Sequence, residues 1–330
     1  MEHKLIVSSS PHIHEQESIS SIMLDVIIAL IPASLMGIYY FGYRAAMVII
    51  TAIAAAVASE YIYEKLTKRR NTVRDLSAIV TGLLLALNLP VTIPLWMTAV
   101  GAVFAIVVVK QLYGGLGKNF MNPALAARCF MLIAWAGAMT SFVEPFAGYG
   151  ADAVSQATPL AILKGTSEGT LPTLSSAFFG VKAGTIGETS GVMLILGGLY
   201  LLWRRIISWK IPVVYIAVFA ALTYLFGTNN TGESQLYYTA LSVCCGGLLL
   251  GAVFMATDYV TTPTTAKGQI IFAAGCGILT FVIRKFGGYP EGVSFSIILM
   301  NVASPLIDRY VRPKKFGAVK SSWKGMDKNA

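Results

Sequence analysis

Long apolar stretches alternate with short polar ones along almost the whole chain. A helix needs about 20 mostly apolar residues to cross a bilayer, and ten stretches approach or meet that length. They cover residues 22–42, 44–63, 76–89, 94–113, 120–139, 187–203, 211–227, 236–256, 269–285 and 291–309. The pattern predicts an all-α polytopic membrane protein with about ten transmembrane helices.

Two of these spans are expected to be broken helices. The third is short, and Pro90 and Pro94 follow it closely. Proline lacks a backbone N–H and interrupts a helix. The eighth carries a Gly-Leu-Leu-Leu run at 247–250 that matches the run at 82–85 in the third. We therefore predict a break in both helices.

The matching runs belong to a weak internal repeat. A Gly-Gly pair follows each run, at 114–115 and 287–288, and an Asn/Pro cluster follows each pair, at 122–123 and 301–305. With five spans per half, the second half would be inverted relative to the first, as in many secondary transporters. The alternative is coincidence, because such short motifs are common in membrane helices.

Lys and Arg residues are concentrated on one side of the predicted membrane. With the N-terminus in the cytoplasm, nineteen of the 25 lie on the cytoplasmic side and Arg128 lies within a span. The five on the outer side are Arg44, Lys164, Lys182, Arg284 and Lys285. Because positive loops stay inside, both termini are predicted to be cytoplasmic.

The chain then divides into five parts. They are a cytoplasmic N-terminal segment 1–21, a first five-helix repeat 22–139, an extracytoplasmic loop 140–186, a second five-helix repeat 187–309 and a basic cytoplasmic tail 310–330. No cleavable signal peptide precedes the first span.

Composition agrees with a membrane protein. Apolar residues make up 55% of the chain, charged residues only 12%, and the mean hydropathy is +0.68. These values exclude a disordered chain, a nucleic-acid-binding domain and a typical cytosolic enzyme. The net charge of +9 reflects basic loops rather than a nucleic-acid partner. The four cysteines lack metal-ligand or redox spacing, so we expect buried thiols and no metal site.

Ionisable and amide side chains near the spans are the candidates for chemistry. Asp258 ends the eighth span beside a Thr/Pro-rich segment, where it could bind a polar ligand or only cap an interface. Asn119 and Asn122 precede the fifth span, and Asn122 before Pro123 is also a good N-cap. Arg128, two turns further, needs a partner or a water-filled cavity.

The outer loop holds the run Ser155-Gln156-Ala157-Thr158-Pro159-Leu160. Thr158 is a good N-cap and Pro159 a good first residue for a short helix. That role alone would explain the pair. A helix start also offers free N–H groups to a phosphate.

This run resembles the threonine motif of the family that contains the RnfD proteins of the Rnf complexes and their counterparts in the sodium-pumping NADH:quinone oxidoreductases. Three other segments support the resemblance: 7–13, with Ser8-Ser9-Ser10-Pro11; 114–124, with Lys118-Asn119-Phe120-Met121-Asn122-Pro123; and 254–258, Phe-Met-Ala-Thr-Asp. Together they cover the chain from about 5 to 310, and the length is more like that of the Rnf members. Gln156 departs from the motif, which commonly has glycine there.

The resemblance implies a membrane electron-transfer subunit of an ion-translocating oxidoreductase, in a prokaryotic cell membrane. A flavin transferase would attach FMN to Thr158 as a phosphoester, within a motif that includes Ser155, Ala157 and Pro159. Asn119, Asn122 and Asp258 match positions associated with a second, non-covalent flavin, riboflavin. The implied partners are the other membrane and peripheral subunits, including a second FMN-bearing subunit on the outer face. Electron flow between ferredoxin and NAD would drive Na⁺ or H⁺ transport.

Three other functions remain open. A secondary transporter or channel for a small polar solute would share the inverted repeats and broken helices, because fold does not decide function. A non-redox scaffold subunit would tolerate replacement of Thr158. The quinone-reducing homologue would use quinone instead of ferredoxin.

Overall fold

A computed structural model describes residues 18–69, 71–146, 156–229, 232, 234–289 and 291–312. This part of the chain is all-α, and its β-pairing is limited to an isolated bridge between Phe142 and Gln156. The predicted segments 1–21 and 310–330 lie largely outside the described residues.

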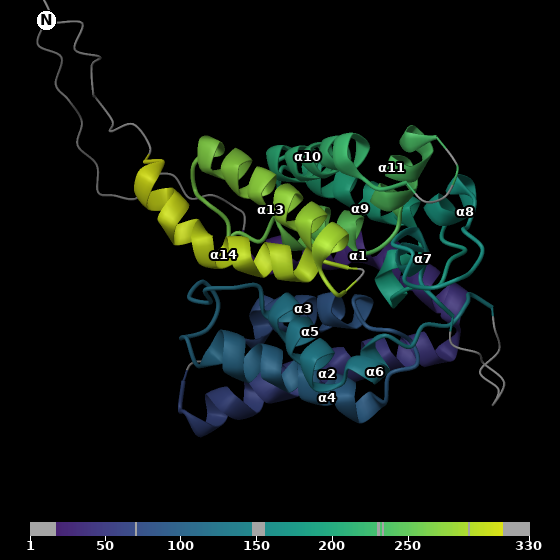
Figure 1. Cartoon of the computed structure of the whole chain (residues 1–330). Coiled ribbons are helices and arrows are strands. Elements are labelled where there is room, and N and C mark those ends of the chain that lie inside the picture. Colours follow the sequence, from purple (N-terminus) through teal and green to yellow (C-terminus); the bar gives the residue numbers. More distant parts are fainter. Residues whose placement is uncertain are drawn as a thin grey trace, which may run out of the picture.

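The first half contains six α-helices (Figure 1). They are α1 Ile19–Phe41, α2 Tyr43–Leu66, α3 Ser77–Leu87, α4 Leu95–Val103, α5 Pro123–Ala134 and α6 Ala136–Met139. A short 3-10 turn, η1 Val73–Asp75, precedes α3, and α4 continues into a π-helical segment, η2 Phe104–Gln111.

Two short helices, α7 Pro159–Leu163 and α8 Leu174–Phe179, lie in the loop between the halves, followed by the 3-10 turn η3 Ile186–Glu188. The second half then has α9 Gly191–Trp203, α10 Lys210–Phe226, α11 Gln235–Cys244, α12 Leu248–Leu250, the π-helical η4 Gly251–Met255, α13 Ala266–Phe286 and α14 Val293–Tyr310.

Several of these helices are long and apolar enough to cross a membrane. By length and composition α1, α2 and α13 qualify, and the bent pair formed by α11 with α12–η4 would make a fourth. Shorter apolar helices occupy most of the other predicted spans. The chain is thus an all-α integral membrane protein, while the count of ten spans and the inverted repeat stay predictions.

Helix breaks fall in the third and eighth predicted spans. In the third, α3 ends at Leu87, and the irregular segment 88–94 carries the chain to α4. In the eighth, α11 and the following helix meet at an angle of 62°. Gly246 at the bend has φ +75°, a left-handed conformation that glycine adopts without a steric cost. The expectation of interrupted helices at both places is confirmed.

Some helix ends differ from the predicted ones. The fifth span, predicted as 120–139, divides at Trp135 into α5 and α6. The sixth begins at Gly191 rather than 187, because Ser190 caps it by accepting the Met193 N–H. Glu188 therefore lies in the turn before the helix.

Helices of the two halves form two groups that face each other, with α2 to α6 on one side and α9 to α14 on the other (Figure 1). Helix α1 packs closely against α9, where Gly197 meets the backbone of Ala29. Asp25 fixes the same contact by accepting hydrogen bonds from Tyr200 (2.7 Å) and Arg204 (2.9 Å). Two pockets remain between the groups.

Candidate functional site

Thr158 is the N-cap of α7. Its Oγ1 accepts a hydrogen bond from the Ala161 N–H at 3.3 Å, and Pro159 is the first helical residue. This local structure is the one that the Thr-Pro pair predicts. The Thr158 side chain is half-buried, whereas Gln156 is exposed.

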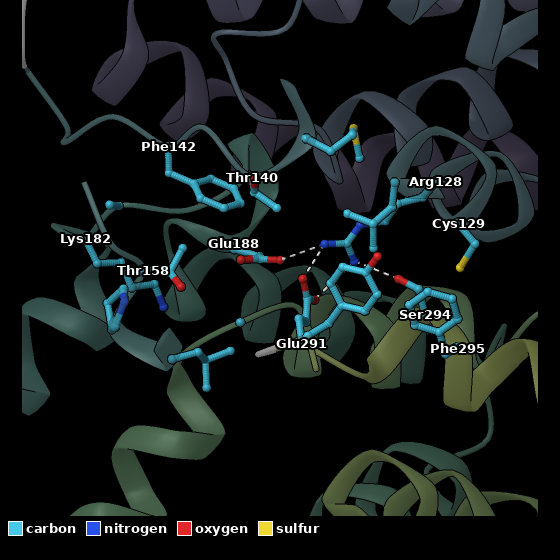
Figure 2. A pocket seen from close by; sticks show the side chains of 17 residues that line it. Arg128, Cys129, Thr140, Phe142, Thr158, Lys182, Glu188, Glu291, Ser294 and Phe295 are labelled. Carbon is cyan, nitrogen blue, oxygen red and sulfur yellow. Dashed lines mark hydrogen bonds and ion pairs between the residues drawn. The ribbon is translucent and has the colours of Figure 1, made fainter. Parts of the chain in front are cut away.

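A pocket opens beside Thr158, with an empty volume of about 740 Å³. We call it the Thr158 pocket (Figure 2). Its lining combines side chains from α5, the loop between the halves, the bend before α12 and the start of α14. The residues that carry charge or aromatic rings are Arg128, Phe142, Lys182, Glu188, Tyr289, Glu291 and Phe295. The volume lies within the range of small-molecule and cofactor sites.

Arg128 is the centre of a buried charge cluster in this pocket. Its guanidinium binds both carboxylate oxygens of Glu291, one at 3.1 Å and the other by a shorter contact. It also donates to Ser294 Oγ at 2.7 Å. Glu188 lies 3.8 Å from the guanidinium, and its Oε1 has no hydrogen-bond partner. The partner that the sequence requires for Arg128 thus comes from the second half.

The same charges complete the bend between α11 and α12. Lys182 donates to the Cys244 carbonyl at 2.5 Å, at the C-terminus of α11. Glu291 accepts the Gly247 N–H at 3.0 Å, at the start of α12. Cations at helix C-termini and anions at N-termini are both favourable. The broken helix is therefore stabilised by the residues that line the Thr158 pocket.

The two carboxyl groups have opposite pKa shifts. Burial and the neighbouring Glu291 raise the pKa of Glu188 to about 7. The pKa of Glu291 is lowered: burial acts to raise it, but the Arg128 charge and hydrogen bonds outweigh that effect. Glu188 is therefore the member of the cluster that can gain or lose a proton near neutral pH.

A second pocket, with an empty volume of about 790 Å³, lies at the other end of α5. We call it the Asp258 pocket. Asn119, Asn122 and Asp258 all line it, with Ser77, Lys110 and Thr257. The three residues that the sequence marks for a second flavin are thus brought together from both halves. The helix begins at Pro123, so Asn119 lies in the loop before it.

The amide groups in this pocket already have protein partners. Asn122 Oδ1 caps α5 by accepting the Ala124 and Leu125 N–H groups, and its Nδ2 donates to the Met255 carbonyl at 3.4 Å. Asp258 accepts from the Thr261 hydroxyl at 3.2 Å, and desolvation raises its pKa. Capping therefore accounts for Asn122, whereas the Asp258 carboxylate keeps room for a further donor.

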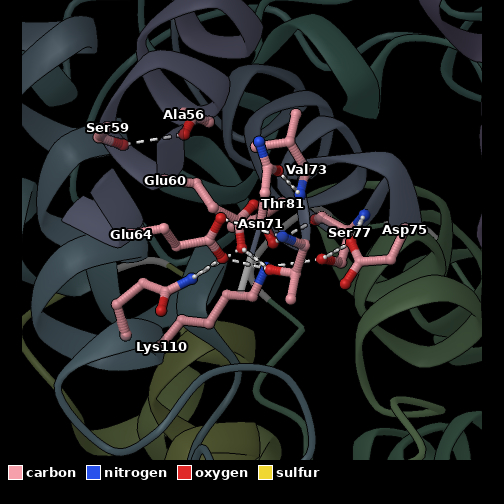
Figure 3. A network of polar contacts seen from close by, with 12 residues as sticks. Ala56, Ser59, Glu60, Glu64, Asn71, Val73, Asp75, Ser77, Thr81 and Lys110 are labelled. Carbon is pink, nitrogen blue, oxygen red and sulfur yellow. Dashed lines mark hydrogen bonds and ion pairs between the residues drawn. The ribbon is translucent and has the colours of Figure 1, made fainter. Parts of the chain in front are cut away.

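A buried polar network supports one wall of the Asp258 pocket (Figure 3). Lys110 in η2 donates to Glu60 Oε1 at 2.7 Å and to Ser77 Oγ at 2.6 Å. Gln111 also donates to Glu60 at 2.8 Å, and Glu60 Oε2 has no partner. The π-helical segment turns both Lys110 and Gln111 toward α2. The network holds a cation at the edge of the pocket.

One helix connects the two pockets. Asn122 at the start of α5 lines the Asp258 pocket, and Arg128 lines the Thr158 pocket. Six residues of helix rise about 9 Å. Groups bound in the two pockets would therefore lie close together along α5.

Most residues that the sequence singles out line one of these pockets. Thr158 and Pro159 line the first; Ala157 precedes it, and Ser155 lies outside the described residues. Sequence reasoning missed Lys182, Glu188 and Glu291. Lys182 had a signal, because it is one of few basic residues on the predicted outer side. The two carboxylates had none, since they lie far from Arg128 in sequence.

The fold and the pockets define an integral membrane protein with cofactor-sized cavities and a buried ionisable cluster between its halves. Residues 6–317 match the NQR2, RnfD, RnfE family, and the chain belongs to this family.

Three relatives illustrate its place there, and each is the D component of its complex. The chain is 49% identical to that of the Na⁺-translocating ferredoxin:NAD⁺ oxidoreductase complex of Acetobacterium woodii, covering 96% of both chains. It is 48% identical to that of the proton-translocating ferredoxin:NAD⁺ oxidoreductase complex of Clostridium ljungdahlii, covering 94% of this chain and 96% of the relative. It is 36% identical to that of the ion-translocating oxidoreductase complex of Escherichia coli, covering 94% and 98%.

Proposed function

We propose that the chain is the electron-carrying membrane subunit of a ferredoxin:NAD⁺ oxidoreductase complex that translocates an ion. Family membership and the relatives' names support the complex and its other subunits as partners. The observation that carries the electron-transfer role is the position of Thr158, at the mouth of a charged, cofactor-sized pocket.

Thr158 would hold FMN through a phosphoester at Oγ1, after modification by a flavin transferase. The residues present fit this group. Lys182 and Arg128 line the pocket and favour a phosphate and an electron-rich ring. Phe142, Tyr289 and Phe295 offer apolar surface for a planar ring. Helix α7 has only five residues, so these cations contribute more than its dipole does.

Bound flavin would supply the electron transfer, and the protein would supply its electrostatic surroundings. Glu188, with a pKa near 7 and an unpartnered oxygen, would take up a proton when negative charge appears in the pocket. Arg128 stays paired with Glu291 and keeps the pocket close to neutral. Thr158 is a tether in this account, not a nucleophile in turnover.

The Asp258 pocket would hold the second flavin, riboflavin. Its Asp258 carboxylate can accept a ring N–H, and Lys110 places a positive charge at the pocket edge. Asn119 and Asn122 shape the pocket through hydrogen bonds to their own backbone surroundings. The α5 rise of about 9 Å between the pockets suits transfer between two groups.

Both termini would be cytoplasmic and the Thr158 loop extracytoplasmic, next to a second FMN-bearing subunit. The coupling ion is not assigned, since the chain is almost equally similar to a Na⁺-translocating and a proton-translocating relative. Coupling by charge compensation, in which flavin reduction favours cation uptake nearby, would fail if oxidised and reduced complexes bound the ion equally well.

In-gel flavin fluorescence of the denatured chain tests the proposal. The chain is expressed with a flavin transferase as wild type, as Thr158→Val and as Thr173→Val. Thr173 is a matched control, because it caps α8 in the same loop by accepting the Ser176 N–H at 3.3 Å. We expect fluorescence in wild type and Thr173→Val only. A dark wild-type band would leave Thr158 as a helix cap and favour the solute transporter.

A further inference from the structure

A third cavity, of about 560 Å³, lies between α7, α10, α11 and α13. Three basic side chains line it, Lys164, Arg284 and Lys285, together with the hydroxyl-bearing Tyr238, Thr223 and Thr228. We call it the basic cleft. None of the described residues that line it is acidic. Glu188 and Glu291 belong to the Thr158 pocket, where Arg128 pairs with them.

Each of the three cations binds backbone carbonyls at the end of a helix. Arg284 donates to the carbonyls of Ser242 (2.7 Å) and Cys245 (3.4 Å), at the end of α11. Lys285 donates to the carbonyl of Phe226 at 2.7 Å, at the end of α10. Lys164 donates to the Gly287 and Tyr289 carbonyls, just after α13.

These contacts leave the cleft positively charged. A helix C-terminus carries about half a negative charge, so three termini offset about half of the three positive charges. Donor capacity is also left: Arg284 is buried, and its Nε has no hydrogen-bond partner. Desolvation lowers the pKa of Lys164, and no carboxylate acts against that effect. An anion would satisfy both conditions.

The cleft also accounts for an exception in the charge pattern. Basic residues are expected to be rare on the outer side of a membrane protein. Of the five on the predicted outer side, three line this cleft, and Lys182 binds the same end of α11. A localised group of cations on that side requires a local reason.

The surface around the cleft has the character of a membrane interface. Tyr224, Leu225, Phe226 and Phe286, at the ends of α10 and α13, are all more than half exposed. Exposed aromatic rings at helix ends are typical of the head-group level of a bilayer. A phosphate that reaches the cleft from this surface would bring acyl chains against the same apolar side chains.

We propose that the basic cleft binds the phosphodiester of an anionic lipid head group. Lys164 and Lys285 supply the charge at the opening, and Arg284 supplies it at the base. Tyr238, Thr223 and Thr228 add hydroxyl groups that can donate to the remaining phosphate or glycerol oxygens.

Lipid binding to the delipidated full chain in detergent tests this proposal. The probes are short-chain phosphatidylglycerol, short-chain phosphatidylcholine and inorganic phosphate. The variants are Lys285→Gln and the double variant Lys164→Gln/Lys285→Gln. Arg44→Gln is the matched control, because it removes a predicted outer charge away from the cleft. Lys285→Arg keeps the charge and checks that the site still folds.

We expect phosphatidylglycerol to bind more tightly than phosphatidylcholine. Affinity should fall about fivefold for each lysine removed, at roughly 1 kcal/mol per basic residue, and remain unchanged in Arg44→Gln and nearly so in Lys285→Arg. Equal loss in Arg44→Gln, or equal binding of both lipids, would overturn the proposal. Full displacement of the lipid by millimolar phosphate would replace the lipid with a soluble anion.

Discussion

Replacing Arg128 with methionine would leave Glu188 and Glu291 in the Thr158 pocket without their cation. Arg128 is 8% exposed and holds Glu291 through two contacts, with Ser294 as a further acceptor. Removing one partner of a buried ion pair costs about 3–5 kcal/mol, because the other charge stays buried. For a chain of this size that corresponds to a loss on the order of 5–10 °C in Tm.

The pH dependence of this loss follows from the two carboxylates. Arg128 lowers the pKa of both Glu188 and Glu291, so its removal raises both values in the folded state. A carboxyl group with a raised folded-state pKa stabilises the fold below its unfolded pKa, and this contribution disappears as the pH rises through the folded value. The Arg128→Met variant should therefore be weakest at pH 8 and recover toward pH 6.

Thermal unfolding in detergent, followed by intrinsic tryptophan fluorescence, measures the effect. The double variant Arg128→Met/Glu291→Met should regain most of the lost stability, because apolar pairs often replace buried ion pairs without loss. Arg74→Met, an exposed arginine, should change stability by less than about 0.5 kcal/mol. A loss below about 1 kcal/mol for the single variant, or a double variant as weak as the summed singles, would refute this reasoning.

Three further predictions concern other parts of the two pockets. Glu188→Gln should abolish the fall in Tm that the raised pKa of Glu188, about 7, predicts for wild type as the pH rises from 5.5 to 8.5; an unchanged pH profile would contradict the assignment. Gly246→Ala, at φ +75° and with the Leu160 and Arg284 side chains close to where a Cβ would lie, should lose about 1–3 kcal/mol in thermal unfolding, whereas Gly288→Ala, in open space, should not; equal stabilities would show that the bend does not need glycine. Asp258→Asn should lower the acid-extractable, non-covalent flavin per chain while in-gel fluorescence persists; unchanged extractable flavin would remove Asp258 from that site.

The sequence carries the local features of this fold well. The Thr158-Pro159 cap, the Asn122-Pro123 cap and the two interrupted helices all follow from residue types whose backbone preferences act over a few positions. The apolar stretches locate most helices, because burial in lipid or protein requires them. Helix ends are less well predicted: Ser190 and Trp135 set boundaries within stretches that are apolar on both sides.

Contacts between the halves are not visible in a single sequence. Arg128 requires a partner, but Glu291 lies 163 residues away, and its choice depends on how α5 and α14 meet. The Glu60–Lys110 pair likewise depends on the π-helical turn of η2, which changes the face that Lys110 presents. Asn119, Asn122 and Asp258 are grouped by family resemblance, and only the three-dimensional packing places them in one pocket.

Mass spectrometry of the tryptic peptide 129–164 tests the central claim most directly. This peptide ends at Lys164 and contains Thr158, with Thr140, Ser141 and Ser155 as the other aliphatic hydroxyl side chains. The account predicts that the peptide from wild-type chain carries one flavin mononucleotide, and that fragmentation assigns it to Thr158. An unmodified peptide from a host with an active flavin transferase, or a flavin on another hydroxyl, would contradict the account.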